Sequence, residues 1–303
     1  MNLPFAALVL LAVVGVSVGL MLAVRRRAPA GGFFHDSNRA VGVFGFIGVS
    51  FSVLLAFVIF MAFESFSAAR TEAAREADAV FQQFEVAQLF QAADRDALQS
   101  QLICYARSVV SDEWPRMRSG DRSERVDAWV VAVEDAVAVV AVNNPKQAAA
   151  LEQFFDETVA RKDGRRVRLQ EAAGVIPAPM WVVLLLGGAC LLGFVLLFAD
   201  SGERLFVQAA LIAVVAISLV APLVLVEYLD HPYRGETGSI MPTSMQFTLD
   251  SMQHERQSTS PVGCTEAGAP DARAGTWQSP SAARPLVSIV PFEEPAVRLD
   301  AAA

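Results

Sequence analysis

Four stretches of the sequence are continuously apolar, and polar residues dominate between and after them. These stretches are Phe5–Val24, Val41–Phe63, Met180–Ala199 and Leu205–Val226, and none contains Asp, Glu, Lys or Arg. Each has roughly 20 residues, enough for a helix to cross a hydrocarbon layer about 30 Å thick. Because backbone polar groups cannot stay unpaired in lipid, we predict four transmembrane helices.

The first apolar stretch has an alternative interpretation as a signal peptide. It lacks a positively charged region before it, its apolar run is too long, and Arg25-Arg26-Arg27 follows it. We therefore interpret it as a retained span. Only residues 25–40 separate the first two stretches and residues 200–204 the last two, so we predict two transmembrane hairpins.

The polar segment between the two pairs is rich in helix-forming residues. Because Gly and Pro are absent from residues 64–112, we predict that the second span continues as one helix to about Val110. Apolar residues recur there at near-helical spacing. They are Ala77, Val80, Phe81, Phe84, Leu98, Leu102 and Tyr105.

Two more helices are expected in this segment. Residues 114–120 contain Trp-Pro and Ser-Gly pairs that predict a turn, and an apolar stripe of helical period follows at 123–142. Asn144 and Pro145 suit the N-cap and first position of a third helix. That helix ends in the basic run Arg161–Arg168, which we interpret as a solvated or headgroup-contacting helix end rather than a ligand site.

These elements predict an all-α integral membrane protein with a soluble helical bundle between two transmembrane hairpins. The expected divisions are 1–63 and 177–230 for the hairpins, 64–176 for the bundle, 231–253 for a short helical extension and 254–303 for a disordered tail. The tail prediction rests on a Ser, Pro, Ala and Gly-rich composition without periodicity.

Composition supports a membrane protein and argues against several other classes. Hydrophobic residues make up 54% of the chain and charged residues 18%, whereas soluble domains have about 25% charged residues. The net charge of −8 is spread without a large block of one sign, so no nucleic-acid partner is expected. The expected partners are the lipid bilayer and further copies of the chain.

Candidate chemistry is sparse. The cysteines Cys104, Cys190 and Cys264 form no CxxC pair or Cys/His cluster, so we predict neither a structural disulfide nor a zinc site. The HExxH, GxSxG, Walker A and GxGxxG motifs are missing. We predict no catalytic residues, no metal and no cofactor, and therefore no enzyme.

Several short pieces occur in a specific order along the chain. They are Ser52–Phe60, Glu64–Phe66, Ala69-Arg70, Glu76-Ala77, Glu113–Met117, Arg168-Leu169, Ile176-Pro177, Met180-Trp181, Leu229–Gly235, Ile240–Pro242 and Phe247. In this order and spacing, over about residues 36–252, the chain resembles the bacterial bestrophin-like domain family of unknown function. The first span and the tail contribute nothing to the resemblance.

The resemblance implies a remote relation to bestrophins, which are pentameric anion channels. It thus implies an oligomeric ion channel in the bacterial plasma membrane. The acidic cluster of a bestrophin calcium clasp is missing, so calcium gating is not carried over. The alternative is a non-conducting membrane scaffold or sensor whose helical segment binds a partner.

By that analogy the second span is the candidate pore helix. Val53, Phe57, Phe60 and Glu64 lie on one helical face, where rings of Phe would form an apolar neck and Glu64 its mouth. The competing interpretation is that these apolar residues face lipid or a neighbouring helix and that Glu64 marks the membrane boundary. A ring of Glu64 favours cations and no span contains Lys or Arg, so the sequence leaves ion selectivity open.

The orientation of the chain receives conflicting signals. Arg25–Arg27 and Arg39 indicate that the short connection of the first hairpin is cytoplasmic, whereas Arg70, Arg75 and Arg161–Arg168 indicate the opposite side. Because the resemblance implies a cytoplasmic bundle, we expect that orientation. Glu227, Asp230 and His231, at the end of the fourth span, suit a boundary turn better than a metal site or proton relay, because all three cannot share one helical face.

Overall fold

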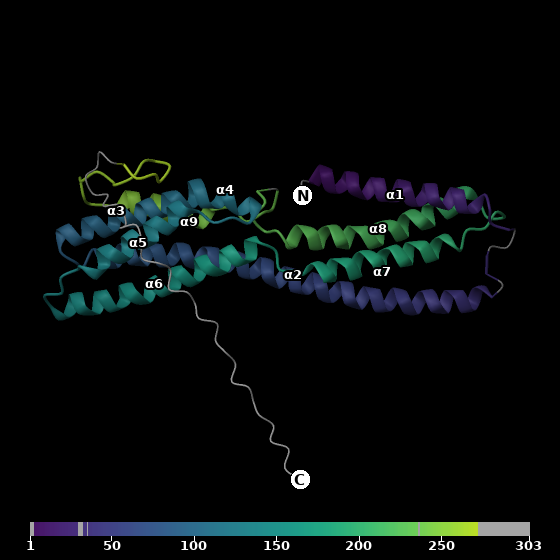
Figure 1. The fold of residues 1–303 in the computed structure, drawn as a ribbon, viewed down its shortest axis with the longest axis horizontal. Helices are drawn as coiled ribbons and strands as arrows, with labels where there is room; N and C mark the ends of the chain where they lie inside the picture. The colour runs from purple at the N-terminus through teal and green to yellow at the C-terminus, as the bar shows by residue number, and fades with distance from the viewer. Residues whose placement is uncertain (1–2, 30–32, 35, 236, 272–303) are drawn as a thin grey trace, which may run out of the picture.

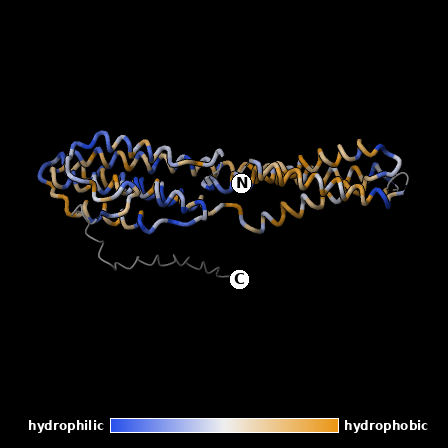
Figure 2. The backbone as a smooth tube through the Cα atoms, turned by 90° about the horizontal axis from the view of Figure 1, so that it is seen from above, coloured by the Kyte–Doolittle hydropathy of each residue, from blue (hydrophilic) through white to orange (hydrophobic). Residues whose placement is uncertain are grey.

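The protein is an elongated, all-helical molecule with an apolar half and a polar half. The computed structural model describes residues 3–29, 33–34, 36–235 and 237–271. Figure 1 shows long helices side by side at one end and a bundle of further helices at the other, and Figure 2 shows that hydrophobic residues dominate the first end and hydrophilic residues the second. The start of α1 lies at the junction of the two halves, on the same side as the bundle (Figure 1).

Within the part of the chain that the structure describes, four helices are long and apolar enough to cross a membrane, as the sequence predicts. They are α1 (Leu3–Arg25), α2 (Ser37–Ala87), α7 (Ala178–Leu196) and α8 (Leu205–Leu229). Helix α7 ends three residues before the predicted Ala199. The N–H groups of residues 197–199 each donate to the carbonyl three residues earlier, so the last turn is of the 3₁₀ type. Asp36 begins α2 by accepting the backbone N–H of Arg39.

The membrane half packs around the second pair of helices. α7 and α8 contact each other, α1 packs mainly against α8, and α2 packs against both α7 and α8. Phe51, Leu55 and Val58 of α2 are buried there against Leu184, among others. The helices of the first pair are thus joined by a short connection in the sequence but held together largely through α8.

The polar half is a bundle in which the second part of α2 packs along α6. Its other helices are α3 (Ala92–Ser108), α4 (Trp114–Arg116), α5 (Glu124–Ala138), α6 (Pro145–Ala172) and α9 (Thr243–Glu255). The predicted stripes form its core, since Val80, Phe84, Leu98, Leu102 and Tyr105 are all fully buried. Asn144 caps α6 as predicted, by accepting the backbone N–H of Gln147.

The prediction of one helix from the second span to Val110 is wrong, because the chain reverses at residues 88–91 without Gly or Pro. Two interactions stabilise the reversal. Phe90 is buried against Phe154 of α6, and the side-chain amide of Gln99 donates to the Phe84 carbonyl near the end of α2. The two halves of the predicted stripe therefore face each other across a hairpin instead of sharing one helix.

The turn predicted at residues 114–120 begins only after Arg116, because Trp114 and Pro115 are still helical. α3 continues into a π-helical turn at Val109–Glu113, then α4, then a 3₁₀ turn at Met117–Ser119. Gly120 ends this run with φ of +77°, a left-handed conformation that favours glycine. Pro115 is tolerated because it lies in the first turn of α4.

Two predictions are wrong. The chain contains a disulfide, and the described part of the predicted disordered tail packs against the bundle. Cys104 of α3 and Cys264 form a disulfide of 2.05 Å. Residues 256–271 dock on α3 and α5, where the Ser108 hydroxyl and the Trp129 indole N–H both donate to the Gly268 carbonyl. The polar composition without periodicity did not indicate these contacts, because the segment binds largely through backbone groups and one covalent bond. Residues 272–303 of the predicted tail lie outside the described residues.

Candidate functional site

The candidate pore residues lie on one uncovered face of α2. In the single chain, Val53 is 66% exposed, Phe57 58% and Phe60 60%, and Glu64 is also exposed. Phe46 and Val49 extend the same stripe by two more turns and are 75% and 66% exposed. From Phe46 to Glu64 the stripe spans about 27 Å along the helix, close to the thickness of a hydrocarbon layer.

The opposite face of α2 holds the helix in place. Phe51, Leu55, Val58 and Ala62 are at most 7% exposed and recur at helical spacing. They pack on α7 and α8, so the orientation of α2 about its own axis is fixed within the chain. Its uncovered stripe therefore points away from the rest of the subunit.

Polar and small residues share the uncovered side of α2 with the stripe. Ser50 and Ser52 are exposed, and each hydroxyl donates to a carbonyl of its own helix four residues earlier. A Cβ placed on Gly42 or Gly45 would meet no atom of the chain within 4 Å. Small residues on a transmembrane helix permit close approach of another helix.

α2 leaves the membrane half unbroken and meets α6 at a glycine. A Cβ on Gly164 would lie 2.9 Å from the Glu72 carbonyl oxygen and 3.0 Å from the Glu76 backbone nitrogen. Both contacts are with backbone atoms, which cannot move aside without shifting the helix. Glycine thus allows the two longest helices of the bundle to touch backbone to backbone.

A network of buried charges lies beside this contact. Arg168, fully buried, donates to both carboxylate oxygens of Glu76 at 2.6 and 2.9 Å, and to Glu113 at 2.8 Å. Arg165 donates to Glu113 and lies 2.8 Å from Asp127. The Tyr105 hydroxyl donates to Glu76 at 2.6 Å. The network joins α2, α3, α5 and α6 at their common centre.

Mutual electrostatic stabilisation keeps this network charged. Burial alone raises the pKa of Glu113, but the guanidinium groups of Arg168 and Arg165 outweigh burial and hold that pKa below its usual value. Burial lowers the pKa of Arg168, while the Glu76 and Glu113 carboxylates raise it well above the usual value. At neutral pH, Glu113 and Arg168 are therefore both ionised.

The interpretation of Arg161–Arg168 as a solvated or headgroup-contacting helix end holds for Lys162 and Arg166, which are exposed, but is wrong for its three arginines on the inner face of α6. Arg161 and Arg168 are 1% and 0% exposed, and the Arg165 side chain is 12% exposed. Their spacing of four and three continues the buried face that starts with Phe154 and Thr158. This periodicity was visible in the sequence, but charge usually marks the solvent side of a helix, and that rule outweighed it.

Glu227, Asp230 and His231 lie at the end of α8 and at the start of the segment that follows it. Asp230 accepts the backbone N–H groups of Val175 and Ile176 at 2.8 and 3.0 Å, just before α7 begins. Glu227 pairs with Arg234 at 2.6 Å, and His231 Nδ1 lies 3.8 Å from the Glu227 carboxylate and 3.9 Å from that of Asp230. Among the residues that the structure describes, no three His, Cys, Asp or Glu side chains are grouped as metal ligands.

Comparison with known proteins identifies the family. The sequence model described as the Bestrophin-like domain matches residues 7–244. The chain belongs to the Bestrophin-like domain family. The match includes α1, which the resemblance seen in the sequence left out, and it ends within α9. No curated protein sequence matches this Bestrophin-like chain.

Solved structures agree on the fold of this Bestrophin-like protein. Two crystal structures of point variants of a bacterial bestrophin homologue from Klebsiella pneumoniae superpose with TM-scores of 0.61 and 0.62. Each is 12% identical to this chain, and the alignments cover 81% of this chain and 99% of the homologue. A further variant, described as a membrane protein, has a TM-score of 0.61 at 13% identity with the same coverage. The shared architecture establishes the all-helical fold.

Proposed function

We propose that this Bestrophin-like chain is one subunit of a homo-oligomeric ion channel that crosses the bacterial plasma membrane several times. Membership of the family supports the proposal. The observation that carries it is the uncovered face of α2, which runs the length of the membrane crossing and ends at a carboxylate.

The arrangement suits a pore better than a lipid-facing surface in two respects. First, this side of α2 carries small or polar residues, which make little favourable contact with lipid tails. They are Ser50, Ser52 and the glycines near the start of the helix. Second, Glu64 lies on the same face as Phe57 and Phe60. In a symmetric oligomer whose axis runs along that face, a ring of carboxylates would lie next to a ring of apolar side chains.

In this channel, Phe57 and Phe60 form a neck that excludes water when narrow. A chain of water is unstable in a narrow apolar constriction, so slight widening changes conduction strongly. Glu64 lies one helical turn beyond Phe60 and concentrates cations at the mouth of the neck.

Conductance of the purified full-length chain in planar bilayers tests the proposal. We expect discrete ion currents, and we expect Phe57→Ala and Phe60→Ala to increase single-channel conductance severalfold by widening the neck. Leu186→Ala is the matched control, because Leu186 is 62% exposed on α7 and should leave conductance unchanged. Glu64→Gln should shift the reversal potential in a salt gradient toward anion permeation.

Two results would contradict the channel. A folded oligomer without conductance would rule out a channel. A stable monomer by detergent-corrected sizing would rule out a pore between identical α2 helices. A monomer would favour the alternative function, a membrane scaffold or sensor whose bundle binds a partner.

A further inference from the structure

A cavity of about 530 Å³ lies where the bundle meets the membrane half. One wall is the part of α2 that begins at Phe66, three residues after the end of the second apolar stretch. The other wall is the segment that leads from α8 into α9, with Ile240 and Met241, and Trp114 of α4 completes the lining. Because α2 has just left its apolar stretch here, the cavity lies at the level expected for lipid headgroups.

Hydrogen bonds hold the walls of this cavity in place. The Trp114 indole N–H donates to the Ile240 carbonyl at 3.1 Å, and the Ile240 N–H donates to the Pro232 carbonyl at 2.8 Å. Gly238 has φ of +89°, and a Cβ there would overlap the Tyr228 hydroxyl, so only glycine fits this close turn. The cavity is thus preformed, as small-molecule sites usually are.

Arg70 is the one charged side chain among the described residues that line the cavity. It is exposed, and within the described part of the chain it has no ion pair or hydrogen bond. The residues three and four positions away from it on α2 are Phe, Ser and Ala, so its own helix offers no carboxylate. The hydroxyl groups of Thr243 and Ser244 add hydrogen-bonding capacity to the lining. The cavity therefore presents one uncompensated positive charge.

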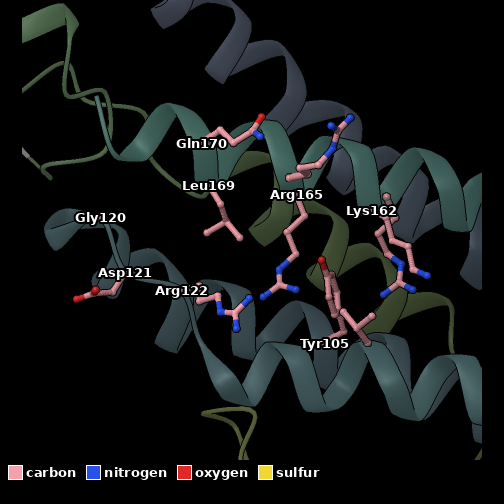
Figure 3. Close-up of a pocket in the computed structure, with 11 residues that line it drawn as sticks. Tyr105, Gly120, Asp121, Arg122, Lys162, Arg165, Leu169 and Gln170 are labelled. Carbon is pink, nitrogen blue, oxygen red and sulfur yellow. The ribbon is translucent and has the colours of Figure 1, made fainter. Parts of the chain in front are cut away.

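A second cavity, between α3, α5 and α6, carries more positive charge but offers less of it to a ligand. Figure 3 shows Arg165 and Lys162 of α6 beside it. Both already pair with carboxylates, Arg165 with Glu113 and Lys162 with Glu134. A cation beside a carboxylate has little net charge to offer an anion. Arg70 has no such partner, so the cavity at the boundary is the better anion site.

An apolar track on α2 leads from the membrane half to Arg70. Phe63, which is 55% exposed, and the half-buried Phe66 precede Arg70 at spacings of three and four, so the three side chains share one helical face. Arg70 lies about 10 Å beyond Phe63 along the axis, and helical Cα–Cβ bonds tilt toward the N-terminus, which for α2 is in the membrane half. Its side chain therefore extends back toward the headgroup layer, which is roughly 5–8 Å thick. This face lies about 120° around the helix from Glu64, clear of the proposed pore.

We propose that the cavity at the boundary binds the headgroup of an anionic phospholipid, whose phosphate pairs with Arg70 and whose acyl chains lie along Phe63. A guanidinium offers two parallel N–H donors to phosphate oxygens, and a cation at the membrane boundary attracts anionic lipids. Free phosphate shares this chemistry, but it would leave the apolar track and the side chains of Ile240 and Met241 unused. A zwitterionic lipid brings its own ammonium group, which compensates its phosphate and weakens the attraction.

The proposal requires a membrane protein but no ion conduction, so a binding measurement tests it separately. Phosphatidylglycerol, added to the full-length chain in non-ionic detergent, is compared with phosphatidylcholine of the same acyl chains and with soluble glycerol 1-phosphate. We expect phosphatidylglycerol to raise the apparent melting temperature by a few degrees more than phosphatidylcholine does, because it binds the folded state. Glycerol 1-phosphate, which carries the phosphate without the acyl chains, should produce little shift.

Two variants separate a built site from general attraction of anionic lipid. Arg70→Gln should weaken phosphatidylglycerol binding about fivefold, as expected for one arginine at a membrane surface, and should leave the lipid-free melting temperature unchanged because Arg70 is exposed and unpaired. Ala74→Leu narrows the cavity without changing any charge, and it should weaken binding by a similar factor. Arg75→Gln is the control, since it removes the same charge from a 56% exposed side chain of α2 outside the lining and should retain nearly all of the binding.

Three outcomes would overturn the proposal. The first is an equal melting temperature in the two lipids. The second is a phosphatidylglycerol effect that survives in Arg70→Gln or in Ala74→Leu, which would place the lipid outside the cavity. The third is an equal shift from glycerol 1-phosphate, which would assign the cavity to a soluble phosphate compound.

Discussion

Arg161 and Arg168 lie two helical turns apart on α6, and both are almost completely buried. Their surroundings differ, because Arg168 has two carboxylate partners whereas the Arg161 guanidinium has no hydrogen-bond partner. Removing a buried charge from a complete network leaves its partners uncompensated, whereas removing one without partners relieves an existing penalty. The same substitution therefore has opposite expected effects at the two positions.

Arg168→Met tests this difference. The variant leaves Glu76 and Glu113 buried beside an apolar side chain, and we expect it to lower the free energy of unfolding by about 3–5 kcal/mol. Thermal or denaturant unfolding of the purified chain measures the loss, with Arg161→Met as the matched control. Equal destabilisation by both substitutions would show that the two arginines have the same structural role.

At the scale of elements, the contact between α2 and α6 depends on the absence of a side chain at Gly164. Gly164→Val inserts atoms against the backbone of Glu72 and Glu76, and we expect it to lower the free energy of unfolding by about 1–3 kcal/mol through overpacking. Gly193→Val on α7 is the control, because a Cβ there meets no atom of the chain within 4 Å. Comparable melting temperatures for both variants would refute the close approach.

The elements also show what the sequence could predict. Long stretches without charged residues predicted the four membrane helices, and helical spacing predicted the buried stripes, because both are local properties of the sequence. The reversal between α2 and α3 depends on Phe90 meeting Phe154, a contact between distant residues that no local signal marks. The docking of the tail also depends on contacts between distant residues, whereas the burial of Arg161, Arg165 and Arg168 had a local signal in their helical spacing. Helical spacing also places Val53, Phe57, Phe60 and Glu64 on one face of α2, and their role in a pore stays a prediction.

At the scale of the whole molecule, the Cys104–Cys264 disulfide bears on which side of the membrane the bundle occupies. Disulfides persist in oxidising compartments and are rare in the cytosol. The positively charged residues Arg25–Arg27 and Arg39 lie at the opposite end of the molecule, where the positive-inside rule places the cytoplasm. We therefore predict that the bundle faces away from the cytoplasm, contrary to the orientation that the bestrophin resemblance implies.

Cysteine labelling in intact cells tests the orientation. In a Cys190→Ala background, a membrane-impermeant maleimide should label the Ser119→Cys variant in the bundle directly. It should label the Ser201→Cys variant, in the connection between α7 and α8, only after the membrane is permeabilised. The reverse pattern, together with reactive thiols at Cys104 and Cys264, would place the bundle in the cytoplasm.

The unbroken course of α2 has a mechanical consequence. Helix α2 contains no Pro, so it behaves as a stiff lever whose pivot is the backbone contact at Gly164. Phe57 lies about 26 Å from that pivot along the helix axis. A tilt of about 5° there would move the Phe57 ring by roughly 2 Å, which approaches the diameter of a water molecule. A rearrangement in the polar half that tilted α2 about this contact would therefore be amplified at the Phe57 ring.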